Sequence, residues 1–113
     1  MATIDVYEQY FEAEHTANGV ERHGALVKLT ADSGSGRIRY EAAVAFFPYR
    51  DEEDFAVSYD DFHSEVLLES EGRRSRKRDK YYAERIREYV DRLAEKADAK
   101  VFWDKPLREA RFG

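Results

Sequence analysis

Charged side chains are segregated in the middle of this chain, and their order indicates the chemistry they can do. Residues 51–71 include nine acidic residues and no Lys or Arg. Gly72 follows, and the next eight residues hold six cations opposed only by Asp79. Long blocks of one sign favour electrostatic contact with a macromolecule over small-molecule chemistry.

The six cations form one candidate site, here called the basic patch: Arg73, Arg74, Arg76, Lys77, Arg78 and Lys80. A helix that begins near Ser75 would place them at its positive end, at a cost of up to about 1 kcal/mol per charge. Helix stability alone does not select this placement, which indicates a contact with phosphate or with an acidic protein surface. The alternative is a solvated loop before a helix capped by Asp79.

The acidic residues form a second candidate site, the acidic tract, over 51–71. Its proposed partner-binding residues are Asp51, Glu52, Glu53, Asp54, Tyr59, Asp60, Asp61 and Glu65. Carboxylates interleaved with aromatic rings can imitate a nucleic-acid strand, with the carboxylates in place of phosphates and the rings in place of bases. Such a face would fit a basic nucleic-acid-binding surface on a partner protein. The alternatives are a solubilising face or an intramolecular partner for the basic patch.

The sequence carries no signature of catalysis or metal binding. It has no cysteine, which excludes disulfides, thiolate nucleophiles and cysteine-ligated metals. Its three histidines, His15, His23 and His63, lack the paired spacing of a zinc motif. There is no Ser–His–Asp pattern, phosphate-binding glycine loop or nucleophile elbow. We therefore expect no metal, no cofactor and no enzymatic activity.

The composition indicates one folded domain over residues 1–113. A hydrophobic content of 42% is too high for a disordered chain. The net charge of -5 argues against broad affinity for nucleic acid but is compatible with a local basic patch. No apolar run approaches the ~20 residues needed to span a bilayer, and the acidic N-terminus does not resemble a signal peptide. A cytoplasmic location without membrane contact is expected, and the oligomeric state is left open.

The first half of the chain predicts three antiparallel strands. Residues 5–15 and 24–31 flank a turn, and a three-residue loop with Gly19 in the left-handed conformation separates apolar from charged pairs. The predicted pairs are Phe11 with Ala25, Tyr7 with Leu29, Glu14 with Arg22 and Glu8 with Lys28. A second turn at 32–36 leads to a third strand over 37–47, with one apolar face: Ile38, Tyr40, Ala42, Val44 and Phe46.

The second half predicts helices and a last strand. Residues 58–71 favour a helix capped by Ser58, although a strand fits nearly as well. Apolar residues recur at helical spacing over 75–97, which indicates a long amphipathic helix. Residues 100–103 are expected to join the sheet, and 107–113 to form a tail. The predicted class is α+β: a three- to four-stranded antiparallel sheet, a long helix in the C-terminal half and a second short helix.

Three segments resemble small acidic accessory proteins of bacterial integrative elements, plasmids and phages, among them anti-CRISPR inhibitors. They are FPYRDEEDFAVSYD (47–60), GRRSRKR (72–78) and WDKPLREA (103–110). The resemblance transfers no functional residue, but it implies a non-enzymatic protein that binds and blocks a host nuclease. The leading hypothesis is an inhibitor whose acidic tract occupies a positively charged channel of a Cas9-type effector. The alternative is a mobile-element accessory protein that binds nucleic acid through the basic patch.

Overall fold

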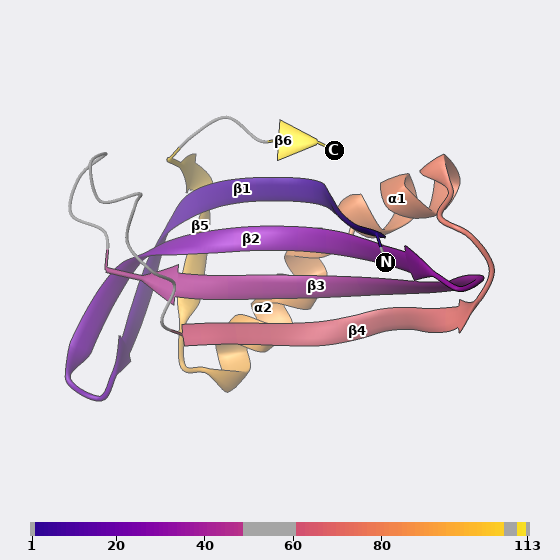
Figure 1. The fold of residues 1–113 in the computed structure, drawn as a ribbon. Helices are drawn as coiled ribbons and strands as arrows, with labels where there is room; N and C mark the ends of the chain where they lie inside the picture. The colour runs from indigo at the N-terminus through magenta and orange to yellow at the C-terminus, as the bar shows by residue number, and fades with distance from the viewer. Residues whose placement is uncertain (1, 49–60, 108–110, 113) are drawn as a thin grey trace.

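The computed structural model describes residues 2–48, 61–107 and 111–112. In this part of the chain, six strands form one antiparallel sheet and two helices lie against it (Figure 1). The elements are β1 (Ala2–Ala17), β2 (Val20–Gly34), β3 (Arg37–Phe47), β4 (Asp61–Glu71), α1 (Arg76–Ala83), α2 (Ile86–Lys96), β5 (Lys100–Pro106) and β6 (Arg111–Phe112). The predicted α+β class is confirmed, with a larger sheet and shorter helices than expected.

The strands follow the order β4-β3-β2-β1-β5, and β6 also pairs with β1. The predicted strand at 100–103 is confirmed, and β5 extends it to Pro106. The prediction of a simple tail over 107–113 is wrong, because Arg111–Phe112 pairs with Tyr7 and Glu8. The short β5 covers only part of the edge of β1. The backbone N–H and C=O groups of β1 beyond it are therefore available to pair with β6.

The first hairpin has the predicted register from Tyr7 to Glu12, but a different turn and a shifted register at both ends. Phe11 pairs with Ala25, and Tyr7 and Glu8 pair as expected. The loop has only two residues, Asn18 and Gly19, both with positive φ, which is the geometry of a type I′ turn. A bulge between Glu12 and His15 adds one residue to β1. This shift gives the pairs on the side away from the turn, from Glu12 to Tyr7, the predicted register. The pairing of Glu14 with Arg22 is therefore wrong: His15 lies opposite Arg22, and Glu14 pairs with Lys100.

The preferred helix over 58–71 is wrong, and the strand alternative is correct for residues 61–71. Strand β4 pairs with β3 along almost its whole length, from Phe46 opposite Asp61 to Arg37 opposite Glu71. Its side chains alternate between half-buried and exposed, because this edge strand has a neighbouring strand on one side only. Phe62 and Val66 stay exposed on the face away from the helices, so the apolar pattern that favoured a helix does not mark a buried stripe.

The predicted long helix over 75–97 is two helices, separated at Glu84 and Arg85. Helix α2 buries four residues, among them Ile86, Val90 and Leu93, whereas the one buried residue of α1 is Asp79. The two segments thus contact the sheet through different chemistry, apolar for α2 and polar for α1. In a single straight helix, the buried residues of the two segments would lie at fixed angles around one axis. The break lets each segment turn its own buried residues toward the sheet.

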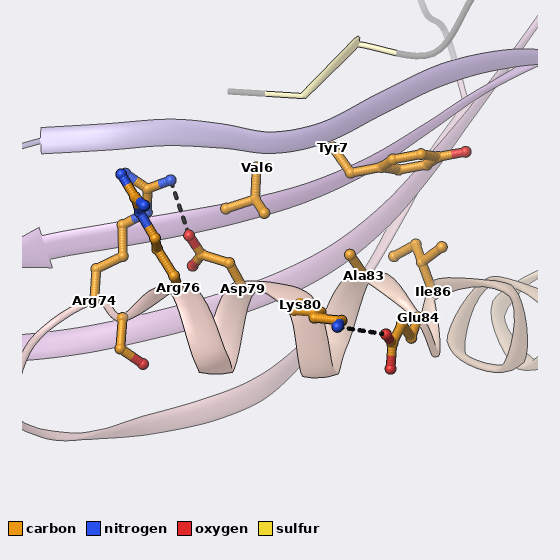
Figure 2. Close-up of a pocket in the computed structure, with 10 residues that line it drawn as sticks. Val6, Tyr7, Arg74, Arg76, Asp79, Lys80, Ala83, Glu84 and Ile86 are labelled. Carbon is orange, nitrogen blue, oxygen red and sulfur yellow. Dashed lines mark ion pairs between the residues drawn. The ribbon is translucent and has the colours of Figure 1, made fainter.

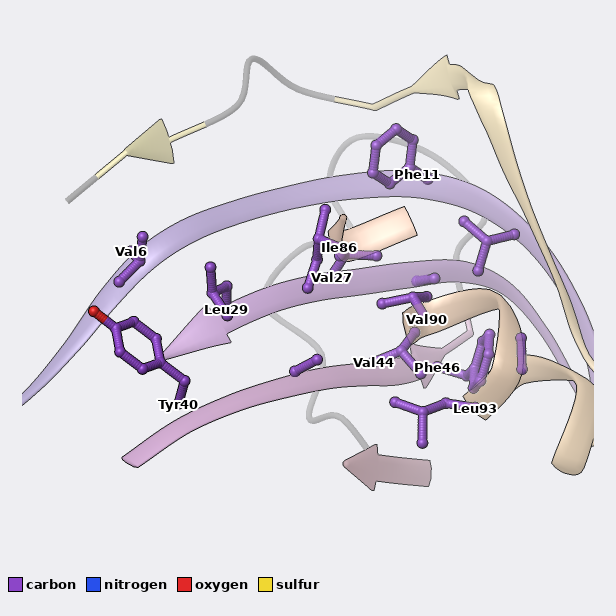
Figure 3. Close-up of a cluster of buried hydrophobic side chains, with 14 of the residues drawn as sticks. Val6, Phe11, Val27, Leu29, Tyr40, Val44, Phe46, Ile86, Val90 and Leu93 are labelled. Carbon is purple, nitrogen blue, oxygen red and sulfur yellow. The ribbon is translucent and has the colours of Figure 1, made fainter. Parts of the chain in front are cut away.

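The main core lies between the sheet and α2 (Figure 3). The predicted apolar face of β3 is confirmed, since Ile38, Tyr40, Ala42, Val44 and Phe46 are all fully buried. Val90 of α2 is also fully buried, and Leu93 is nearly so. Burying side chains of this size stabilises the fold by about 1.5–3 kcal/mol each. A smaller cluster of Leu26, Ala45 and Phe47 lies on the opposite face.

Candidate functional site: a groove beside the basic patch

The basic patch begins where β4 ends. Gly72 has φ +132°, and its N–H donates a hydrogen bond to the carbonyl oxygen of Gly36 at 2.9 Å. Glycine is favoured at this position because other residues are strained at that φ. Ser75 then caps α1, and its hydroxyl accepts a hydrogen bond from the backbone N–H of Arg78 at 3.2 Å. The predicted helix start near Ser75 is confirmed.

Asp79 fixes α1 to the sheet. Its Oδ1 accepts a hydrogen bond from the hydroxyl of Tyr40 at 2.7 Å, and its Oδ2 lies 2.9 Å from Nη2 of Arg74. Tyr40 is fully buried and Asp79 is 9% exposed. Burial and the hydrogen bond to Asp79 raise the pKa of Tyr40 to about 12, so the hydroxyl stays a donor at neutral pH. Two donors therefore offset the charge of this buried carboxylate.

A groove of about 780 Å³ lies between β1 and this anchored helix (Figure 2). Four apolar or aromatic residues from three elements line part of it: Val6, Tyr7, Ala83 and Ile86. The polar lining comes from α1, the segment before it and the residue that follows it: Arg74, Ser75, Arg76, Asp79, Lys80 and Glu84. Lys80 is 3.9 Å from Glu84, across the last turn of α1. The groove thus combines an apolar surface with cations.

Four cations of the basic patch are exposed and have no ion pair with any residue in the described ranges: Arg73, Arg76, Lys77 and Arg78. Arg74 and Lys80 differ, since Asp79 and Glu84 are their partners. The four unpaired cations lie at or before the start of α1, where the helix dipole adds positive potential. The positive potential of these cations attracts an anionic group, and a bound anion reduces the repulsion among them.

The acidic tract is described only over β4. Asp51, Glu52, Glu53, Asp54, Tyr59 and Asp60 lie outside the described residues. Glu65 accepts two hydrogen bonds from Nη2 of Arg92, at 3.0 and 3.1 Å, which connect β4 to α2. Asp61 is also engaged within the fold, as described next. Asp61 and Glu65 thus have ion-pair partners elsewhere in the fold. No ion pair within the described ranges joins the acidic tract to the basic patch.

Asp61 lies between two histidines at the start of β4. One carboxylate oxygen contacts Nε2 of His15, and the other is 3.1 Å from Nε2 of His63. His15 belongs to β1, so its 3% exposed side chain reaches β4 across the curled end of the sheet and stacks near Phe46. Burial opposes ionisation of Asp61, but the hydrogen bond and charge of His63 and the contact with His15 outweigh it and lower its pKa. No group of three or more ligating side chains in the described segments is arranged to hold a metal ion.

Sequence reasoning identified the basic patch but missed the groove. Asp79 stood out as the one acid among six cations, yet nothing in the sequence indicates that Tyr40 is its partner. Val6 and Tyr7 are almost seventy positions away from Arg74. Only the packing of α1 against β1 brings them together, and no local pattern predicts that contact.

Comparison of the chain with family models, with curated protein sequences and with solved structures gives no match. Neither of the helices in the described part of the chain is long and apolar enough to cross a membrane. The groove and the four unpaired cations beside it are the features from which a function is inferred.

Proposed function

We propose that this protein is a non-enzymatic binder of nucleic acid, and that the basic patch contacts the phosphate backbone. The observation that carries the proposal is the set of exposed cations without a partner among the described residues, Arg73, Arg76, Lys77 and Arg78, beside a groove. Solvated charge runs are common, but these cations gather at the positive end of a helix, where they repel one another. A phosphate group relieves that repulsion, whereas water does so only by screening.

The acidic remainder of the chain shapes this interaction. With a net charge of -5, most of the surface repels a polyanion, so binding is confined to the patch. Few phosphates are then contacted, so the salt dependence of the affinity reports a small number of ion contacts. If four phosphates of a single strand are neutralised, the logarithm of the binding constant falls with the logarithm of salt concentration with a slope of about -3.

Fluorescence anisotropy with labelled DNA and RNA of about 12 nucleotides, single-stranded and duplex, tests this proposal over a salt series. The test variant neutralises the unpaired cations: Arg73→Gln, Arg76→Gln, Lys77→Gln and Arg78→Gln. The matched control makes the same change in net charge at four exposed cations elsewhere: Arg87→Gln, Lys96→Gln, Lys100→Gln and Lys105→Gln.

The test variant should lose most of its affinity and its salt slope should approach zero, while the control variant keeps a slope near that of the natural protein. Equal losses in both variants would mean that only net charge matters and that the basic patch is not a site. Absence of binding to every oligonucleotide at low salt would reject nucleic acid as the ligand.

A second function is a protein-binding inhibitor, of the anti-CRISPR kind, that uses the acidic tract against a basic nucleic-acid channel. One observation favours it beyond the tract itself: Phe62 and Val66, directly after the most acidic segment, are 61% and 43% exposed. An apolar strip beside carboxylates suits a protein interface better than a solvated face does.

The acidic-tract hypothesis has its own test, binding of the protein to a purified Cas9-type effector at increasing salt. Reversing four charges together, Asp51→Lys, Glu52→Lys, Glu53→Lys and Asp54→Lys, should abolish binding without changing the unfolding midpoint. Binding that survives this reversal would rule out the acidic face as the contact.

A further inference from the structure

The groove has more apolar surface than a phosphate site requires. Phosphate contacts need cations and N–H donors, and the exposed cations of the basic patch already supply these. The partly exposed side chains of Tyr7 and Ala83, with the buried Val6 and Ile86 behind them, instead offer a surface for a flat, weakly polar group. At about 780 Å³ the groove is within the usual size range of small-ligand sites.

The arginines and most of the apolar lining lie at different ends of the groove, with Val6 between them and Glu84 at the apolar end. Figure 2 shows Arg74 and Arg76 at one end, and Tyr7, Ala83 and Ile86 at the other. Lys80 lies between them on α1, with its ammonium group toward Glu84. A ligand along this axis meets positive charge first and apolar surface next, which is the order of a phosphate and its attached base.

We propose that the groove receives an unstacked nucleobase, which makes single-stranded nucleic acid the ligand of this protein. The inference rests on the nucleic-acid binding proposed above, and it adds which form is bound. In a duplex both faces of each base are covered by stacking, so the apolar end of the groove stays empty. In a single strand a base can turn outward and pack on an aromatic side chain while its phosphate stays near the cations.

The charges that face the groove are compatible with this ligand. The carboxylate of Asp79 is held by Tyr40 and Arg74, so its charge is offset before a phosphate arrives. Burial raises the pKa of Tyr7, so its ring remains neutral and suited to stacking. Glu84 is the remaining acid of the lining, and Lys80 is its partner.

The decisive experiment compares three probes of equal length, about 12 nucleotides, with the natural protein: single-stranded DNA, the same backbone with every base removed, and duplex DNA. Removing the bases leaves the phosphates in place, so the salt slope should be retained while affinity falls about tenfold or more. Equal affinity for the intact and abasic strands would overturn the inference and leave phosphate binding standing. No binding to any of the three probes would instead remove the proposed function.

A pair of variants locates the base. Tyr7→Leu removes the ring in the groove, and the matched control Tyr81→Leu removes a 49% exposed ring of α1 that is not part of the groove lining. Tyr7→Leu should lower affinity for the intact strand toward that for the abasic strand, and Tyr81→Leu should change neither. If Tyr81→Leu alone weakens binding, the base stacks on the outer surface of α1 and the groove is not its site. Circular dichroism identifies a variant that fails to fold, and the probe comparison with the natural protein then decides.

Discussion

Replacement of Asp79 by alanine should destabilise this fold far more than replacement of an ordinary helix-surface acid. Asp79 is 9% exposed and connects α1 to the sheet through Tyr40 and to the basic patch through Arg74. The substitution leaves the hydroxyl of Tyr40 buried without its carboxylate acceptor. It also removes the ion pair between Asp79 and the guanidinium of Arg74.

The magnitude follows from the two contacts. A buried hydroxyl that loses its acceptor costs about 1–3 kcal/mol. The carbonyl oxygen of Ser75, 3.5 Å from the Tyr40 hydroxyl, is a weak substitute acceptor and places the cost near the middle of that range. The ion pair with the partly exposed Arg74 adds about 0.5 kcal/mol. The free energy of unfolding should therefore fall by about 2–3 kcal/mol.

Urea unfolding of four proteins measures this effect: the natural chain, Asp79→Ala, Tyr40→Phe and the double variant. Because Tyr40→Phe removes the stranded hydroxyl, Asp79→Ala should cost about 1–2 kcal/mol less in that background. Asp91→Ala is the control, since Asp91 accepts a 2.8 Å hydrogen bond from Trp103 in an exposed setting and should cost less than about 1 kcal/mol. A cost of Asp79→Ala that is the same with and without the Tyr40 hydroxyl would refute the role assigned to this contact.

Three further predictions concern other parts of the fold. The pKa of Asp61 is lower in the folded chain than in the unfolded one, so the folded state binds fewer protons and stability should fall as pH drops below about 4; urea midpoints of Asp61→Asn should show a shallower fall. Gly72→Ala should cost about 1–3 kcal/mol because φ is +132°, and a loss under about 0.5 kcal/mol would mean that the turn rearranges. Leu29→Ala, at a fully buried position, should cost about 2–5 kcal/mol in chemical unfolding, whereas Phe62→Ala, at a 61% exposed position, should cost less than about 0.5 kcal/mol.

The parts of the fold that could be predicted are those where the local pattern and the tertiary environment agree. Strand β3 alternates between charged and apolar residues over 37–42, its predicted apolar face is fully buried, and its bounds at 37 and 47 are as expected. A helix start near Ser75 was also predicted, and its cause is local, since the Ser75 hydroxyl accepts a hydrogen bond from the backbone N–H three residues on. Both features depend on interactions within a few residues or on a single face, which the order of residue types reveals directly.

The parts that could not be predicted depend on long-range contacts. Edge strand β4 carries exposed apolar side chains at spacings that also fit a helix, and only pairing with β3 selects the strand. Nothing at Glu84 or Arg85 marks a helix end, because the break follows from the different surfaces that α1 and α2 contact. The bulge near Glu12 depends on β1 pairing with both β2 and β5.

The sequence by itself determined the α+β class, the separation of acidic from basic residues at Gly72, and the position of the basic patch at the start of a helix. Those features follow from composition and from local spacing. Only the tertiary structure decided which cations of the patch are unpaired, that Asp79 is held by Tyr40, and that β1 and α1 enclose a groove beside them. These contacts join residues tens of positions apart, and their free energy comes from burial and pairing that exist only once the sheet and helices have packed together.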